Sequence, residues 1–272
     1  MQQQTKLSTH CLLIAVMLIG SQAASAGGHI RSIEFTPAEQ AFIAANPTLR
    51  LCVDPNWVPY EGLTADGEYT GLIPEYMREI EARTGMRFEV VNTASWAETW
   101  ALATDGGCDV MSGLNQTQDR EPYIAFTEPY ITEPAVLVTQ AGRTDINKIP
   151  DLDGKRLAVV QGYALDEKVG LDFPGIQRVY VKDLSEGLAQ VEAGSVDAIA
   201  DSQFIVKSLL KTMDSDNFRV VDETRYLNVL RLGVRRDGYR LYTIMNKAVK
   251  SLSYADQDEI RERYMAAMTA PN

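Results

Sequence analysis

Short apolar runs alternate with amphipathic segments through the first half of the chain. Three runs have the composition of buried strands, at residues 49–53, 87–91 and 110–111. Helices are predicted before and between them: one is capped by Thr36, one carries an apolar stripe ahead of Gly85, and one follows the Ser95 capping box. Short strands that alternate with helices predict an α/β fold with a mostly parallel sheet.

The second half of the chain repeats this arrangement. Strands are predicted at residues 134–139, 156–160, 179–181 and 198–200. Residues 101–109 resemble residues 189–197, because each segment is a helix end, a glycine and then an aspartate that opens an apolar strand. The similarity suggests two lobes of related build. A last strand at 229–234 and helices at 239–252 and 255–268 follow.

The strand at 110–111 runs into a polar segment that we expect to form a ligand-binding loop. Within nine residues it offers Ser112, the bare backbone of Gly113, Asn115, Thr117 and Arg120. These groups suit an anion such as a carboxylate, which the planar guanidinium can hold through two parallel hydrogen bonds. Open parallel sheets bind ligands at the carboxyl ends of their strands. The alternative is a surface loop whose arginine pairs with an adjacent acid, Asp119 or Glu121.

Further candidates follow other predicted strands. The segment from residue 54 to 60 contains two prolines, which exclude regular structure. Its Trp57 and Tyr60 form either a stacking wall for a ligand or ordinary packing contacts. Gly162 lies at a strand–helix junction, where backbone N–H groups face a ligand or make a plain turn. Asp201 either faces the ligand of the first lobe across a cleft or caps the next helix.

Net charge and histidine content limit the partners and the kinds of catalytic site that can be expected. The chain of 272 residues has a formal net charge of −11 and no run rich in Lys or Arg, so nucleic acid is not expected as a partner. Both histidines, His10 and His29, lie near the N-terminus. We therefore expect no histidine-based metal site or general base, and no cofactor motif occurs. Catalysis would have to use carboxylates, Lys, Tyr or Cys.

The N-terminal residues have the pattern of a secretory signal. Lys6 precedes an apolar run at 11–19, and small residues follow, which predicts a cleaved leader of residues 1–26; an uncleaved anchor is the alternative. We expect the remainder to be soluble in the periplasm. In an oxidising compartment Cys52 and Cys108 either form a disulfide or remain buried thiols.

Six motifs occur in a fixed order: DPNWVPYE (54–61), GLIPE (71–75), TQDR (117–120), FTEPY (126–130), LDGK (152–155) and GSVDA (194–198). Together they resemble the bacterial extracellular solute-binding proteins of family 3, the periplasmic binders of polar amino acids and related solutes. The resemblance covers about residues 34–268. Residues 35–42 and 161–164 are most similar to the variant that forms the venus-flytrap sensor domains of membrane histidine kinases. Because no kinase follows, we expect a free-standing protein.

The resemblance implies a type II periplasmic-binding-protein fold of two α/β lobes joined by two crossovers. The first lobe would comprise residues 34–132 and 231–272, and the second residues 133–230. The lobes would close on a ligand by a hinge. In the family, the residue matching Arg120 holds the ligand carboxylate and the aromatic matching Trp57 stacks on the ligand.

The sequence departs from the family's amino-acid binders in the second lobe. The loop that carries a threonine hydroxyl in those proteins reads Gly162-Tyr163-Ala164. The aspartate that holds the ligand ammonium is replaced by Ser202, and Asp201 stands one residue early. A one-residue offset on a strand turns a side chain to the other face. A small carboxylate is therefore expected in preference to a standard α-amino acid.

The predicted function is capture of a small carboxylate or amino-acid-like solute by a monomer. The partner would be an ABC transporter permease or a membrane sensor. One alternative is a dehydratase-like enzyme that acts on a small organic acid, with Asp201 or Glu133 as its acid. Another is an interaction protein whose cleft is degenerate.

Overall fold

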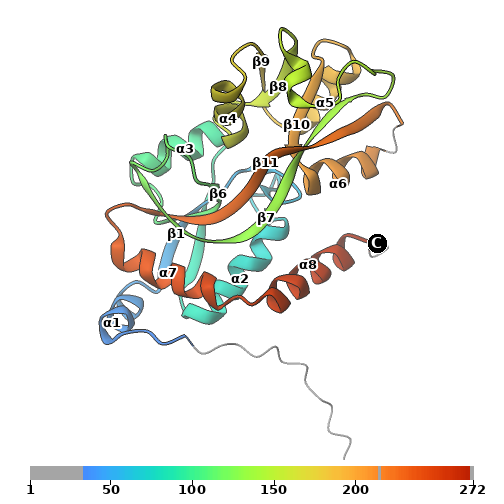
Figure 1. Cartoon of the computed structure of the whole chain (residues 1–272). Helices are drawn as coiled ribbons and strands as arrows, with labels where there is room; N and C mark the ends of the chain where they lie inside the picture. Colours follow the sequence, from blue (N-terminus) through green and yellow to red (C-terminus); the bar gives the residue numbers. More distant parts are fainter. Residues whose placement is uncertain (1–32, 214–215, 270–272) are drawn as a thin grey trace, which may run out of the picture.

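Two α/β lobes share one eight-stranded sheet in the computed structural model, in which residues 33–213 and 216–269 are described (Figure 1). The strand order is β5-β1-β6-β11-β7-β10-β8-β9. The first three strands are parallel to one another and form the first lobe's part of the sheet. The last three are also parallel and form the second lobe's part. The predicted two-lobed α/β architecture is confirmed.

The first lobe contains α1 (Pro37–Ala45), β1 (Thr48–Cys52), β2 (Asn56–Trp57), β3 (Glu61–Leu63), β4 (Tyr69–Thr70), α2 (Leu72–Thr84), β5 (Arg87–Val91), α3 (Trp96–Thr104) and β6 (Val110–Asn115). The second contains η1 (Ile149–Leu152), β8 (Arg156–Val160), α4 (Ala164–Asp172), β9 (Gln177–Val181), α5 (Leu184–Glu192), β10 (Ala198–Ser202) and α6 (Gln203–Met213). Two long strands, β7 (Ile124–Gln140) and β11 (Phe218–Arg235), are shared, and α7 (Tyr239–Ser251) and α8 (Tyr254–Thr269) return to the first lobe.

The strands β7 and β11 connect the lobes, running side by side and antiparallel from one to the other (Figure 1). In the second lobe, Val136 and Val138 of β7 pack in one core cluster, while Leu137 packs in another. Both faces of the sheet are therefore covered by helices, which explains the continuous apolar run in the sequence. Both strands continue across residues 132–133 and 230–231. The exact lobe boundaries consequently stay a prediction.

Three strands differ from the sequence prediction. β6 extends to Asn115, so Ser112, Gly113 and Asn115 belong to the strand and not to the loop after it. β7 begins ten residues before the predicted strand, and β11 begins eleven residues before its prediction. The extensions contain polar residues and one proline, Pro129, which obscure the strand pattern. Polar residues are tolerated there because one face of the two connecting strands does not pack on a core. The segment 54–60 contains the short strand β2, which pairs with β3, so the prediction that its prolines exclude regular structure is wrong.

Helix ends follow the predicted capping chemistry. Thr36 accepts a hydrogen bond from the Glu39 amide, and the Glu39 carboxylate accepts one from the Thr36 amide, which completes a capping box. Gly85 ends α2 with φ 73°, in the left-handed region that glycine adopts without strain. Ser95 caps α3, but Glu98 accepts from the Ala94 amide, one residue away from the predicted partner.

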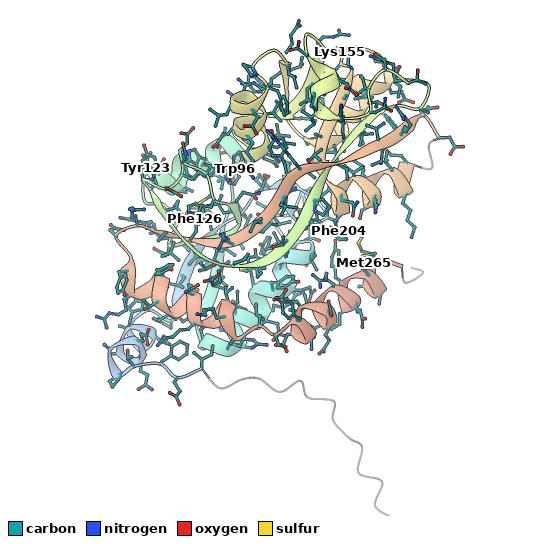
Figure 2. The ribbon with its side chains drawn as sticks, viewed as in Figure 1. Trp96, Tyr123, Phe126, Lys155, Phe204 and Met265 are labelled. Atoms are coloured by element: carbon teal, nitrogen blue, oxygen red, sulfur yellow. A yellow bond between two sulfur atoms is a disulfide. The ribbon has the colours of Figure 1, made fainter. Side chains whose placement is uncertain are left out.

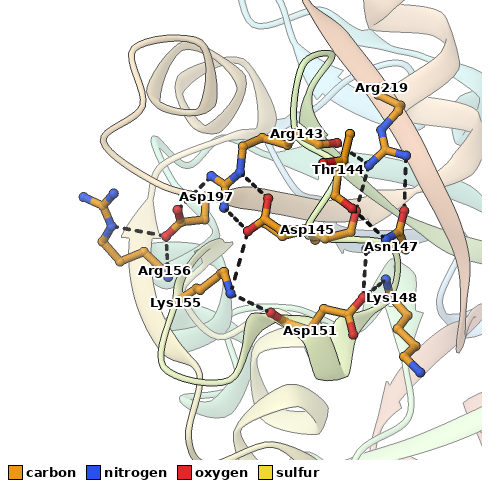
Figure 3. A network of polar contacts seen from close by, with 11 residues as sticks. Arg143, Thr144, Asp145, Asn147, Lys148, Asp151, Lys155, Arg156, Asp197 and Arg219 are labelled. Atoms are coloured by element: carbon orange, nitrogen blue, oxygen red, sulfur yellow. Dashed lines mark hydrogen bonds and ion pairs between the residues drawn. The ribbon is translucent and has the colours of Figure 1, made fainter.

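The internal similarity between the lobes extends to their hydrogen bonds. In the first lobe, Asp109 accepts from the Arg50 backbone amide at 2.8 Å, and Arg50 also donates to a glycine carbonyl. In the second lobe, Asp197 accepts from the Arg156 amide at 2.9 Å, and Arg156 donates to the matching glycine. Figure 3 shows Asp197 between Arg156 and Arg143 in a wider network, in which Arg143 ties the connector before β8 to this aspartate. Each aspartate therefore fixes the start of the strand that follows it beside the adjacent strand of the sheet.

The two described cysteines, Cys52 and Cys108, form a disulfide with a Cα separation of 5.7 Å. It joins the end of β1 to a residue two positions before β6 and settles the choice left open by the sequence. Within residues 33–213 and 216–269, no helix has the length and apolar character needed to cross a membrane. The predicted leader of residues 1–26 lies outside the described part of the chain.

Candidate functional site

A cleft with a cavity of about 40 Å³ lies between the lobes, at the carboxyl ends of β1, β6, β8 and β10. Six residues of the first lobe line it: Asp54, Trp57, Trp96, Gly113, Asn115 and Arg120. The second lobe contributes the polar residues Tyr163, Asp166 and Asp201, together with apolar residues of β8, α4 and β10. Asn228 lies on the connecting strand β11. Six predicted site residues, Trp57, Gly113, Asn115, Arg120, Tyr163 and Asp201, are therefore brought together.

Arg120 is buried, with 4% of its surface exposed, so the alternative of a surface arginine paired with Asp119 or Glu121 is wrong. Its guanidinium lies 5.3 Å from the ring of Trp96 and 5.6 Å from that of Trp100, two residues that α3 places on one face. It donates to the Asn115 carbonyl at 2.9 Å. A second donor reaches the Gly162 carbonyl of the other lobe at 2.8 Å. Burial lowers the pKa of Arg120 to about 10, so the group is charged at neutral pH.

The remaining residues of the polar segment have different positions. Gly113 lines the cleft, and a Cβ there would lie 2.6 Å from Ile73. Asn115 lines it too, and its side chain bonds to β11 through Asn228 and the Val229 amide. Ser112 is not part of the lining, because its hydroxyl donates to Glu61 behind the cleft. Thr117 lies in an adjoining open groove, and its buried hydroxyl has no hydrogen-bond partner among the described residues.

The two predicted aromatic residues have separate roles. Trp57 lines the cleft, and its indole N–H is buried without a well-formed hydrogen bond and faces the carboxylate of Asp201. Tyr60 is fully buried beneath it, with ring centroids 4.8 Å apart in an edge-to-face arrangement. Ser202 donates to the Tyr60 hydroxyl at 3.0 Å, so both residues lie behind the lining. Trp57 is thus a cleft wall, whereas Tyr60 is a packing residue.

The second lobe presents a loop and a strand end. Gly162 adopts φ 76°, which turns its carbonyl toward Arg120 and Trp96, and it does not itself line the cleft. Tyr163 lines the cleft, and its hydroxyl donates to Asp54 of the first lobe. Asp201 lies within β10 and accepts from the Ser202 amide, so the helix-cap alternative is wrong. Figure 2 shows Trp96 at the junction of the lobes, beside α4.

Buried carboxyl groups surround this cleft. Burial raises the pKa of Asp54 to about 6, although the nearby Arg120 opposes this shift. Burial also raises the pKa of Asp201 to about 7, and the charge of Asp54 raises it further. Glu61, behind the wall, accepts from Tyr69, Ser112 and the Asp54 amide, and burial raises its pKa to about 7. A guanidinium at one end and carboxylates at the other allow the cleft to hold a solute that carries both charges. Among the described residues, no cluster of three or more His, Cys, Asp or Glu could hold a metal ion.

Sequence reasoning missed three contributors to this site. Asp54 directly follows the predicted strand at 49–53, as the polar segment follows the predicted strand at 110–111, and that position was a usable signal. Trp96 and Trp100 gave no such signal, because an aromatic pair four residues apart on a helix ordinarily belongs to a core.

Comparison with known proteins identifies related chains. Residues 49–267 match the family described as bacterial extracellular solute-binding proteins, family 3. The virulence sensor protein BvgS of Bordetella pertussis is 23% identical over 231 residues, and the alignment covers 85% of this chain and 19% of that protein. The histidine-binding periplasmic protein of Salmonella typhimurium is 27% identical over 229 residues, covering 79% of this chain and 86% of that one.

A solved structure shares the fold. The periplasmic VFT2 domain of B. pertussis BvgS superposes with a TM-score of 0.78 and 23% identity, covering 85% of this chain and 99% of that domain. The chain spans a fifth or less of the length of the sensor proteins that it matches. Since the family match extends over most of the sequence, the chain belongs to the bacterial extracellular solute-binding proteins, family 3.

Proposed function

We propose that this protein captures a small amino-acid-like solute in the cleft, with the solute's carboxylate on Arg120 and its amino group near Asp54 and Asp201. The observation that carries this proposal is the buried guanidinium of Arg120, aimed across the cleft from between two tryptophan rings. A carboxylate with the right geometry takes two of its donors. Closing the lobes removes water and strengthens the ion pair. The name of the histidine-binding relative agrees with a solute of this class.

The structure of the cleft changes how the departure from the family pattern at Ser202 is interpreted. The offset aspartate, Asp201, lines the same cleft as Arg120, so a negative group is available for an amino group despite the serine. Asp54 is a second one, on the opposite lobe. An amino-acid-like solute is therefore favoured over the simple carboxylate that the sequence pattern suggested.

A thermal-shift screen tests the solute class. The panel contains amino acids, together with matched analogues that lack either the carboxylate or the amino group. The proposal expects stabilisation by one or more amino acids and little by either analogue. Stabilisation by simple carboxylic acids alone would restore the narrower carboxylate hypothesis, and a flat response throughout would favour the degenerate-cleft alternative.

Binding without turnover is part of the proposal. Of the two acids named for the enzymatic alternative, only Asp201 lines the cleft; Glu133 accepts from the Phe204 amide and lies outside the lining. The named relatives are sensor and binding proteins. Mass spectrometry of a solute after long incubation should recover it unchanged, whereas a dehydrated product would establish an enzyme.

We further infer a periplasmic monomer that serves either an ABC transporter permease or a membrane sensor. The family, the predicted leader at residues 1–26 and the disulfide support export. N-terminal sequencing of the protein from a periplasmic fraction should begin at Gly27. A start at Met1 would contradict cleavage, and a solution mass of twice that of the chain from Gly27 to Asn272 would contradict the monomer.

A further inference from the structure

The loop before α4 supplies a hydrogen-bond acceptor to Arg120. The Gly162 carbonyl accepts from Arg120 at 2.8 Å and from the Trp96 indole N–H at 3.2 Å. With the Asn115 carbonyl on the other donor, the guanidinium is held by protein oxygens from both lobes. A carbonyl oxygen offers lone pairs in a plane, as one carboxylate oxygen does. The place that the proposed solute carboxylate needs is therefore taken by the backbone of the second lobe.

Tyr163, the next residue, supplies a hydrogen-bond partner to the acidic side of the cleft. The Tyr163 hydroxyl donates to the Asp54 carboxylate, whose other oxygen accepts from the Asn56 amide. The Tyr163 ring meets Trp57 and Trp96 edge-on, with centroids 5.8 Å and 6.0 Å away. The Tyr163 hydroxyl therefore places a hydrogen-bond donor against a buried carboxylate and among aromatic rings. A solute amino group would bind in the same surroundings and to the same acceptor.

We propose that Tyr163 is a specificity-determining residue of this cleft, because the Gly162–Tyr163 loop occupies the solute's place and must be displaced before a solute binds. This inference rests on the proposed function for its solute, but whether the loop closes the cleft can be measured without a solute. Only a molecule that supplies both an acceptor for Arg120 and a donor for Asp54 replaces both contacts that the loop makes. Arg120 keeps its ion pair with Glu167 and Asp54 its bond from the Asn56 amide, but a solute with only one of these groups leaves the other buried charge without the contact that the loop made, which is costly.

The tryptophans provide a direct assay of closure. The chain has three, Trp57, Trp96 and Trp100, and all of them border the cleft or Arg120. Quenching of their fluorescence by acrylamide therefore reports how open the cleft is. In ligand-free protein we expect Tyr163→Phe, which keeps the ring and removes the hydroxyl, to shift the equilibrium about tenfold toward the open form, as loss of one hydrogen bond to a charged acceptor does. Tyr180→Phe, an exposed tyrosine of β9, is the matched control.

The expected result is weak quenching in the wild type and in Tyr180→Phe, and clearly stronger quenching in Tyr163→Phe. Equal quenching in all three proteins would overturn the inference. If Tyr163→Phe does not fold, Asp54→Asn gives the same test from the other lobe, because an amide keeps the acceptor for Asn56 and weakens the bond to Tyr163.

Solute affinity gives a second, independent readout. When the loop must first be released, the apparent dissociation constant is the intrinsic one divided by the fraction of protein that is open. Tyr163→Phe should consequently bind the solute from the screen about tenfold more tightly than the wild type. Weaker binding by this variant would mean that the hydroxyl contacts the solute and would overturn the displacement. If no solute binds to either protein, the proposed function fails, while the quenching comparison still decides whether the loop closes the cleft.

Discussion

Asp201 should make the stability of this protein fall as the pH rises through the weakly acidic range. Burial raises the pKa of its carboxyl from 3.8 to about 7. The unfolded chain therefore releases this proton near the lower value, and the folded protein near the upper value. Between them the folded state binds more protons, so the free energy of unfolding decreases with increasing pH and levels off above pH 7. At about 1.4 kcal/mol per pKa unit, the loss is at most about 4 kcal/mol, because Asp54 and Glu133 titrate together with it.

The substitution Asp201→Asn removes this titration and keeps an oxygen for the Ser202 amide. Urea unfolding should give a free energy about 2–4 kcal/mol above that of the wild type at pH 8, and about the same free energy at pH 4. Asp66→Asn, in the exposed turn after β3, is the control and should change neither value. A difference between Asp201→Asn and the wild type that is the same at both pH values would refute the reasoning.

Two further changes test the contribution of the disulfide to stability and the packing of the cleft wall. Reduction of the Cys52–Cys108 disulfide, or a double change to alanine, should lower the free energy of unfolding by about 4 kcal/mol, because the bond closes a loop of 56 residues; an unchanged urea midpoint after reduction would contradict this. Gly113→Ala places a Cβ 2.6 Å from Ile73 and 3.4 Å from Trp57, so the cleft wall must shift. We expect solute affinity to fall about tenfold, which is about 1.4 kcal/mol, while the melting temperature changes little; unaltered affinity would show that the wall at Trp57 does not contact the solute.

Local signals in the sequence were sufficient for most of the fold. Thr36 and Gly85 mark helix ends through their own backbone and side-chain chemistry, and each is found at the predicted position. The repeated aspartate at the start of two strands, Asp109 and Asp197, correctly indicated two related lobes, because the same contact recurs in both. The first half of β7 was missed, since its residues 124–133 mix polar side chains with a proline. That composition suits a strand shared by two lobes, but it is equally typical of a loop.

The site was less predictable, because its contacts join segments far apart in the sequence. The polar segment and Arg120 could be found from their place after a strand, and the cleft contains both Arg120 and Asp201. The tryptophan rings around Arg120 depend on how α3 packs, and the bond from Tyr163 to Asp54 spans 109 residues. Whether Cys52 and Cys108 were bonded also depended on a Cα separation that no sequence pattern gives.

The most direct test of the proposed binding site is a calorimetric titration of the solute found in the screen, with wild type, Arg120→Ala and the control Arg156→Ala. Arg156 pairs with Asp197 in the second lobe and does not line the cleft. If Arg120 holds the solute carboxylate in the closed cleft, Arg120→Ala should lose about 2–5 kcal/mol of binding free energy, and Arg156→Ala should lose none. Equal affinity of Arg120→Ala and the wild type would contradict the site proposed for this protein.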